Sequence, residues 1–174
     1  MLRYRKIETA DNEKLAKIIR NNLEKFHLNI PGTIYFDSQL DYLSEYYNDD
    51  TKNRVYFVAL DEENQVIGGV GLAEFEGFSD CAEIQKLYLE DSTKGKGYGK
   101  ELMKIAEEWA KEAGYKKLYL ETHSNLKFDM SLYDIEDYTL LNNICNYLSF
   151  ATGIPALICF GNIACDLRYL LYYR

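Results

Sequence analysis

The sequence predicts a mixed α/β fold, in which a central, twisted and mostly antiparallel sheet of about six or seven strands carries helices on both faces. Three observations predict it. Residues 55–89 contain three strand-like runs joined by two polar turns, the pattern of an antiparallel meander. Residues 99–114 have helical periodicity, and residues 117–122 return to a short apolar run. A strand, a helix and a strand in succession form a crossover, which makes two strands of the sheet parallel.

The N-terminal third is expected to add one strand and two helices. Residues 2–7 form the first strand candidate, and polar capping residues at positions 9–12 precede apolar residues at helical spacing. Pro31 and Gly32 mark a loop. A second helix is expected over residues 37–47, with Leu40 and Leu43 facing inward.

The middle of the chain supplies the meander and the crossover. Strands are expected at residues 55–60, 65–75 and 82–89, the last after a turn at residues 77–80. A helix starts near Gly99, buries one apolar stripe and ends at Gly114. The strand at residues 117–122 follows it and completes the crossover.

The C-terminal part is expected to hold a helix at residues 125–136 and a last strand at residues 166–172. The expected order of elements is therefore β-α-α-β-β-β-α-β-α-β-β, with residues 142–163 left unassigned. A length of 174 residues suits one compact domain, residues 1–174.

The chain is acidic, with a formal net charge of -8 and a pI near 4.9. This charge disfavours a nucleic-acid partner and suits a cationic substrate, although it also serves solubility alone. His27 and His123 have no ligand-like spacing to the four cysteines, so no metal site is expected. The most apolar stretch, residues 147–160, is shorter than the ~20 residues that cross a bilayer. We therefore expect no membrane contact, reduced thiols and a cytoplasmic protein.

Residues 93–100 form a glycine-rich loop between a strand and a helix. Glycine lets the backbone turn tightly, and successive N–H groups beside a helix N-terminus form a cradle for an anion. Lys94, Lys96 and Lys100 add positive charge, so a pyrophosphate is the expected guest. The P-loop pattern does not fit, because Gly99-Lys100 is followed by Glu101. A dinucleotide-binding turn would follow the first strand of a parallel sheet, and this loop follows a meander.

The loop resembles the acetyl-CoA signature (Gln/Arg)-x-x-Gly-x-(Gly/Ala) of the GNAT superfamily of N-acetyltransferases, with Lys94, Gly97 and Gly99 at its defined positions. Residues 84–89 resemble the cofactor strand of that family, and residues 118–122 resemble the strand after the helix. Asn125, eight residues before Tyr133, resembles the Asn…Tyr helix of the same family. Residues 142–163 do not resemble the usual short hairpin, which leaves the acceptor pocket undefined.

The resemblance implies a sheet that is splayed open at the acetyl-CoA site, between residues 87–89 and residues 118–122. Acetyl-CoA would be the acyl donor, with no metal. Its pantetheine arm would pair with the backbone of Leu87 and Leu89, and the loop amides would hold the pyrophosphate. The cofactor-binding residues implied are Leu87, Tyr88, Leu89, Lys94, Gly95, Lys96, Gly97, Tyr98, Gly99, Lys100 and Asn125.

Two side chains become candidate catalytic groups by the same resemblance. Direct attack of an amine on the thioester requires that a proton be removed, and the departing thiolate can take one up. Glu83 stands at the position of the general-base glutamate of the histone-acetylating branch, and Glu74 is the alternative base. Tyr133 matches the tyrosine that acts as general acid or positions the sulfur, although a place in the core would also suit it.

The predicted function is transfer of an acetyl group from acetyl-CoA to a primary amine, on a small cationic or amino-acid-like molecule. The alternative is a non-catalytic acyl-CoA-binding or sensing domain of the same fold, which needs the loop but no base. The tail at residues 167–173 is apolar and rich in tyrosine, so pairing across a homodimer is a further hypothesis. The candidates to line the acceptor pocket, each equally suited to the core, are Tyr35, Phe36, Tyr42, Tyr46 and Tyr47.

Overall fold

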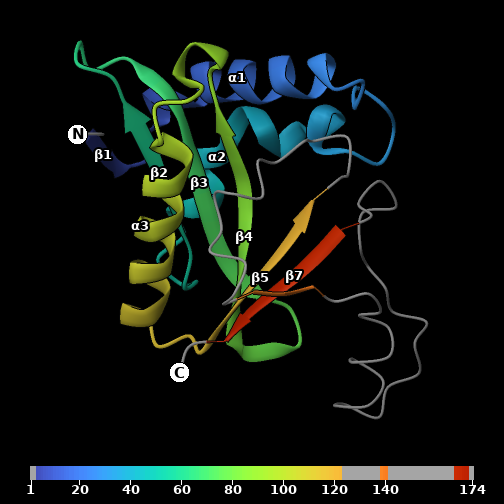
Figure 1. Cartoon of the computed structure of the whole chain (residues 1–174), viewed down its shortest axis with the longest axis vertical. Coiled ribbons are helices and arrows are strands. Elements are labelled where there is room, and N and C mark those ends of the chain that lie inside the picture. Colours follow the sequence, from blue (N-terminus) through green and yellow to red (C-terminus); the bar gives the residue numbers. More distant parts are fainter. Residues whose placement is uncertain (1–2, 123–137, 141–166, 173–174) are drawn as a thin grey trace.

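The computed structural model of the chain describes residues 3–122, 138–140 and 167–172 (Figure 1). Within them it has three α-helices and seven strands. In chain order these elements are β1 (Arg3–Lys6), α1 (Asn12–Lys25), α2 (Leu43–Tyr47), β2 (Val55–Leu60), β3 (Val66–Phe75), β4 (Phe78–Leu89), α3 (Tyr98–Glu112), β5 (Lys117–Thr122), β6 (Tyr138–Leu140) and β7 (Leu167–Tyr172).

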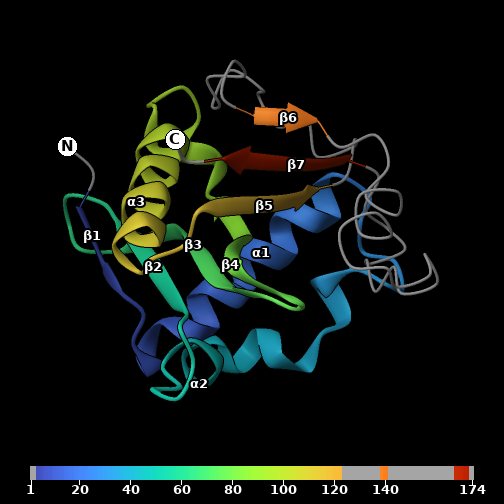
Figure 2. The same cartoon turned by 90° about the horizontal axis from the view of Figure 1, so that it is seen from below.

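The seven strands form one mixed sheet in the order β1-β2-β3-β4-β5-β7-β6. The β4–β5 pair is parallel, and every other neighbouring pair is antiparallel. Helix α3 covers one face of the sheet, and α1 and α2 cover the other (Figure 2). The predicted mixed α/β fold is therefore confirmed, including the crossover through α3.

Two apolar clusters hold the helices on the sheet. Helix α3 buries Leu102, Ala106 and Ala110, spaced four residues apart, against strands β2 to β5. Helix α1 buries Leu15 and Ile19 in the second cluster, together with residues of α2 and the opposite face of β2. The amphipathic patterns that predicted these helices are the patterns that bury them.

The second predicted helix, at residues 37–47, is only partly confirmed. The segment Ser38–Tyr42 is a 3-10 helix, and α2 begins at Leu43. The carboxylate of Asp37 accepts the amide of Gln39 at 2.9 Å, which favours a tight first turn. At Tyr42, φ is -131°, so the α-helix cannot extend back through this residue.

The remaining predictions differ at their ends. Strand β4 begins at Phe78, four residues before the predicted start, because the turn from β3 is confined to Glu76 and Gly77. The last strand is confirmed as β7, and both of its edges are paired within the chain, to β5 and to β6. Residues 169–171 of β7 therefore offer no open edge at which a second copy of the chain could pair in a homodimer. The predicted helix at 125–136 lies outside the described residues.

Asp11 ties β1 to the start of α1. Its carboxylate is buried, accepts two hydrogen bonds from Arg5 at 2.6 and 2.9 Å, and accepts the amide of Glu8 at 2.8 Å. Burial alone raises the pKa of Asp11. The hydrogen bonds and the Arg5 charge together lower the pKa by more than burial raises it, so it ends below its ordinary value. The ionised form therefore stabilises the fold.

We expect Asp11→Asn to lower the free energy of unfolding by about 1–3 kcal/mol at neutral pH. The wild-type advantage should be full above the ordinary carboxyl pKa of 3.8 and should disappear as the pH falls through the lowered pKa of the folded state. Urea unfolding at pH 7 and at progressively lower pH measures this difference. Glu8→Gln is the control, because Glu8 is mostly exposed and lies 3.7 Å from Arg5.

Candidate active site

Strands β4 and β5 separate halfway along their length. Their parallel ladder runs from Cys81↔Lys117 to Ile84↔Leu120 and ends there, although β4 continues to Leu89. The two strands diverge beyond this point (Figure 1). The predicted splay of the sheet is confirmed, and it leaves one edge of the second half of β4 without a neighbouring strand among the described residues.

A bulge in β4 lies beside this opening. Gly71 pairs with Gln85 and Gly69 pairs with Tyr88, so Lys86 and Leu87 together oppose a single residue of β3. Lys86 has φ of +50°, which is unusual for a lysine. Its carbonyl oxygen accepts a hydrogen bond from the buried Tyr56 hydroxyl at 3.0 Å. Tyr56 thus holds the bulge in place.

The bulge changes which side chains face α1 and α2. Before it, Gln85 faces this side and contacts Tyr47 of α2; after it, Tyr88 packs in the same cluster as α1. Leu87 and Leu89 pack instead against the α3 side. The three residues expected along the cofactor arm therefore alternate across the strand.

Glu83 is held by a short hydrogen-bonded chain. Tyr47 Oη donates to Gln85 Oε1 at 2.8 Å, and Gln85 Nε2 donates to Glu83 Oε2 at 2.5 Å. Burial raises the pKa of Tyr47 well above its ordinary value, so its hydroxyl remains protonated and able to donate. Glu83 itself is only partly buried. The chain fixes one carboxylate oxygen of Glu83.

Glycine at position 71 makes room for this chain. A Cβ atom added there would lie 2.3 Å from Tyr47 Oη and 2.6 Å from Tyr47 Cζ. Tyr47 is buried, so its ring cannot swing into solvent. The close approach of ring and strand is possible because Gly71 lacks a side chain.

We expect Gly71→Ala to destabilise the protein by about 1–3 kcal/mol, through overpacking against Tyr47. Urea unfolding measures the loss. Combined with Tyr47→Leu, the two changes should be non-additive, because the shorter side chain removes the clash. A Gly71→Ala protein as stable as the wild type would contradict the close approach.

Glu74, the alternative base, is engaged elsewhere. Its carboxylate is paired with Arg54 Nη2 at 2.5 Å and Nε at 3.3 Å, and with Lys52 at 4.0 Å. Burial alone raises the pKa of Glu74. The hydrogen bond and the charge of Arg54 contribute to a larger opposite effect, so the pKa ends below its ordinary value. A carboxylate held ionised in this way is a weak proton acceptor. The geometry favours Glu83 of the two candidates.

The glycine-rich loop has the backbone of an anion cradle. Gly95 and Gly97 have φ of +74° and +78°, and Gly97 is the N-cap of α3. A Cβ added at either glycine would meet no atom within 4 Å, so the space in front of the loop is open. The first amides of α3, those of Tyr98, Gly99 and Lys100, have no acceptor within the helix. These amides and the helix dipole suit a phosphate group.

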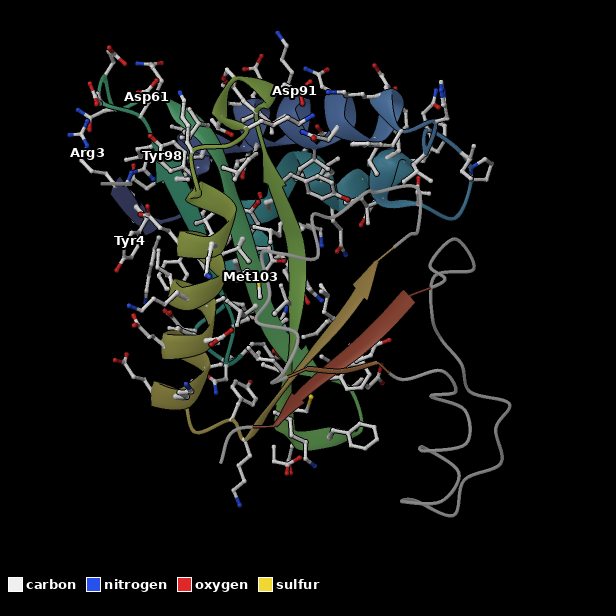
Figure 3. The ribbon with its side chains drawn as sticks, in the orientation of Figure 1. Arg3, Tyr4, Asp61, Asp91, Tyr98 and Met103 are labelled. Carbon is white, nitrogen blue, oxygen red and sulfur yellow. The ribbon has the colours of Figure 1, made fainter. Side chains whose placement is uncertain are left out.

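Lysines surround the cradle. Lys94 Nζ pairs with Asp91 at 2.8 Å, Lys25 of α1 contacts the same carboxylate, and Lys96 Nζ lies 6.0 Å from the Tyr98 ring centroid. Asp91 lies just before the loop and Tyr98 lies within it, near the end of β4 (Figure 3). A groove of about 310 Å³ runs between α1 and residues 90–92, just before this loop. The loop is thus a local positive site in an acidic chain.

The carbonyl of Leu89 accepts a hydrogen bond from Asn22 Nδ2 at 3.0 Å, so one of its two lone pairs is occupied by α1. Asn125 and Tyr133 lie outside the described residues. Tyr46 and Tyr47 lie beside the bulge, with Lys86 over both rings, whereas Phe36 and Tyr42 are mostly exposed.

Several contributors escaped the sequence analysis. Gln85 could have been found, because residues 83 and 85 of one strand share a face. Tyr56, Arg54 and Lys86 could not, since their roles depend on a bulge and on an ion pair that no local pattern signals. The thiol of Cys81 is buried, and burial raises its pKa to about 12, so the thiolate form needed for nucleophilic attack is disfavoured.

In the described ranges, which omit 123–137 and 141–166, His, Cys, Asp and Glu side chains form no group of three or more able to hold a metal ion. The helices of the same ranges are too short or too polar to cross a bilayer.

Comparison with known proteins points to one family of acetyltransferases. The sequence profile of the acetyltransferase (GNAT) family matches residues 20–134. The Escherichia coli K12 protein described as the uncharacterized N-acetyltransferase YjgM is 33% identical over 168 residues, which span 95% of this chain and 92% of that protein.

Solved structures agree in fold. An acetyltransferase of the GNAT family from Staphylococcus aureus Mu50 superposes with a TM-score of 0.77 at 14% identity, over 100% of both chains. The PaiA N-acetyltransferase of Thermoplasma acidophilum, in complex with coenzyme A, superposes with a TM-score of 0.70 at 18% identity, over 99% of both chains.

Proposed function

This chain belongs to the acetyltransferase (GNAT) family, and we propose from this that it transfers the acetyl group of acetyl-CoA to a primary amine on a small cationic or amino-acid-like molecule. The observation that carries the proposal is that the β4–β5 ladder ends at Ile84, while β4 continues toward the open glycine cradle at the start of α3. An extended ligand with an anionic end fits such a path. The coenzyme A bound by the PaiA relative has this chemistry.

In the proposed complex, residues of the opening and the loop hold the cofactor. The edge of β4 after Ile84, which has no neighbouring strand among the described residues, offers backbone groups to the pantetheine amides near Leu87 and Leu89. The pyrophosphate lies on the amides of residues 95–100, with Lys94, Lys96 and Lys100 beside it. When bound, acetyl-CoA supplies the activated acyl group. Tyr88 and Asn125 complete the proposed contacts.

Glu83 is the proposed general base. It lies on β4 two residues before the ladder-free stretch begins, and Gln85 fixes one of its carboxylate oxygens. The second oxygen is the one proposed to take the proton of the acceptor ammonium, directly or through a water molecule. Tyr133 is the proposed general acid that returns a proton to the departing thiolate.

The test begins with binding of acetyl-CoA by calorimetry, followed by release of free thiol in the presence of a panel of amines. We expect micromolar binding and amine-dependent thiol release. Binding without turnover on any amine would favour the alternative, a non-catalytic acyl-CoA-binding or sensing domain. A folded protein that binds no acetyl-CoA would overturn both.

Three coarser features complete the proposal. Residues 1–174 act as one domain, and the acceptor is a small molecule rather than a nucleic acid. The enzyme works in the cytoplasm, with its own cysteines as reduced thiols. A homodimer remains part of the proposal, formed by surfaces other than the paired edges of β7. Light scattering at micromolar concentration tests it, and a monomeric mass would contradict it.

A further inference from the structure

Lys86 places a positive charge on the face of β4 that carries the proposed base. The bulge turns its side chain toward α2, where Nζ lies 5.7 Å from the Tyr46 ring centroid and 5.9 Å from the Tyr47 ring centroid. Tyr47 is the residue that holds Gln85, and Gln85 holds Glu83. The ammonium and the carboxylate therefore share one aromatic-walled side of the strand.

The surroundings of this ammonium compensate its charge poorly. Lys86 is partly buried, and among the described residues no carboxylate oxygen forms an ion pair with it within 4.0 Å. Both ring contacts are near the ~6 Å limit at which a cation still interacts with an aromatic face. Burial lowers the pKa of Lys86, and the charges of Asp37 and Glu83 oppose this shift.

Arg54, the neighbouring cation, shows the contrast. Its guanidinium carbon lies 4.1 Å from the centroid of the same Tyr46 ring, and it forms a two-point pair with Glu74. Arg54 is thus neutralised by Glu74, whereas Lys86 has no such ion pair in the part of the chain that the structure describes. A partly buried cation without an ion pair is costly in the free protein, and a ligand that brings an anion to it removes part of this cost.

We propose that Lys86 determines the specificity of the acceptor site by binding a carboxylate of the acceptor, so that the substrate is an amino acid or a closely similar molecule. This inference rests on the proposed function, because it takes Glu83 as the group beside which the acceptor amine lies. An amine at Glu83 and a carboxylate at Lys86 match the two charges of an amino acid. The half-buried ring of Tyr46 would contact its apolar atoms.

The same arrangement disfavours a diamine or polyamine. Such an acceptor would place a second ammonium near Lys86 once the first had reached Glu83, and two like charges in a partly buried site repel each other. The inference therefore selects the amino-acid-like class over the small cationic class, despite the acidic net charge of the chain.

The test uses pairs of acceptors that differ by the carboxylate: L-phenylalanine with 2-phenylethylamine, L-leucine with 3-methylbutylamine, and L-lysine with 1,5-diaminopentane. We expect wild-type kcat/KM to be about 10–100-fold higher for the amino acid of a pair, the range of a charge-assisted hydrogen bond. Lys86→Met should remove this preference through KM and leave acetyl-CoA binding unchanged. Turnover of 1,5-diaminopentane should rise in the same variant, because the repulsion between Lys86 and its second ammonium is lost. Lys86→Arg should restore part of it. Lys104→Met, on the exposed face of α3, is the control.

Calorimetric binding of each pair to the protein saturated with coenzyme A separates the two proposals. Binding of the amino acids that is lost in Lys86→Met, without turnover, would support the carboxylate site and overturn the proposed enzyme activity. Equal turnover or binding within the pairs, or an unchanged preference in a folded Lys86→Met protein, would overturn the role of Lys86. Binding of neither member of any pair would also overturn it.

Discussion

Glu83→Gln is expected to lower kcat/KM for the acceptor amine by roughly 10²–10⁴-fold, the usual contribution of a general base. The amide is nearly isosteric with the carboxylate, and Gln85 can rotate its own amide to keep a hydrogen bond with it. The fold and the cofactor site should therefore be preserved. Acetyl-CoA affinity measured by calorimetry should change by less than about threefold, because the loop cradle is untouched.

Two matched variants make this result specific. Glu76→Gln removes the same charge from the exposed turn between β3 and β4, and we expect no change in turnover. Glu74→Gln breaks the pair with Arg54, so it should lower the free energy of unfolding and leave kcat nearly unchanged. Should Glu74→Gln lose turnover while Glu83→Gln keeps it, the assignment of the base would be reversed.

The pH dependence of kcat/KM is a second test of Glu83 as the general base. If Glu83 removes the proton, kcat/KM should fall on the acidic side as its carboxylate is protonated, and Glu83→Gln should lack that limb of the profile. Its remaining turnover should follow the ionisation of the amine alone. An acidic limb that is the same in both proteins would assign it to another group.

Much of the fold could be predicted because local pattern and burial agree. Helix α3 buries the apolar stripe that its sequence shows. Strand β2 begins and ends at the predicted residues, since polar residues bound it on both sides. The segment at residues 37–47 was harder, because Asp37 can cap a 3-10 turn or an α-helix equally well. The sequence does not predict the strand at residues 138–140, since three residues carry too little periodicity.

The site was predictable where it depends on backbone and not where it depends on contacts. The positive φ of Gly95 and Gly97 follows from residue type, so the cradle could be expected from the sequence. The bulge at Lys86 is occupied by a lysine and held by a tyrosine thirty residues away, and a regular strand would have placed this side chain on the other face. The pairing of Glu74 with Arg54 is likewise a product of tertiary structure.

Gly97→Glu is expected to abolish acetyl-CoA binding, with the affinity reduced by at least about 100-fold, or ~2.7 kcal/mol. A side chain at this position would extend into the open space in front of the first amides of α3. Glutamate would bring its negative charge to the place proposed for the pyrophosphate, where it would itself accept the amide hydrogen bonds. Steric exclusion and charge repulsion therefore act in the same direction.

Backbone strain has to be separated from this effect, because φ of Gly97 is +78° and any side chain there costs about 1–2 kcal/mol of stability. Gly114 provides the matched control: its φ is +88°, a Cβ there also meets no atom within 4 Å, and it lies at the opposite end of α3. Gly114→Glu should lose similar stability and keep wild-type affinity, and Gly97→Ala should bind acetyl-CoA more tightly than Gly97→Glu. Equal losses of affinity in Gly97→Glu and Gly114→Glu would mean that the loop contributes only to folding. Affinity lost in Gly97→Glu alone would identify the amides at the start of α3 as the groups that bind the pyrophosphate.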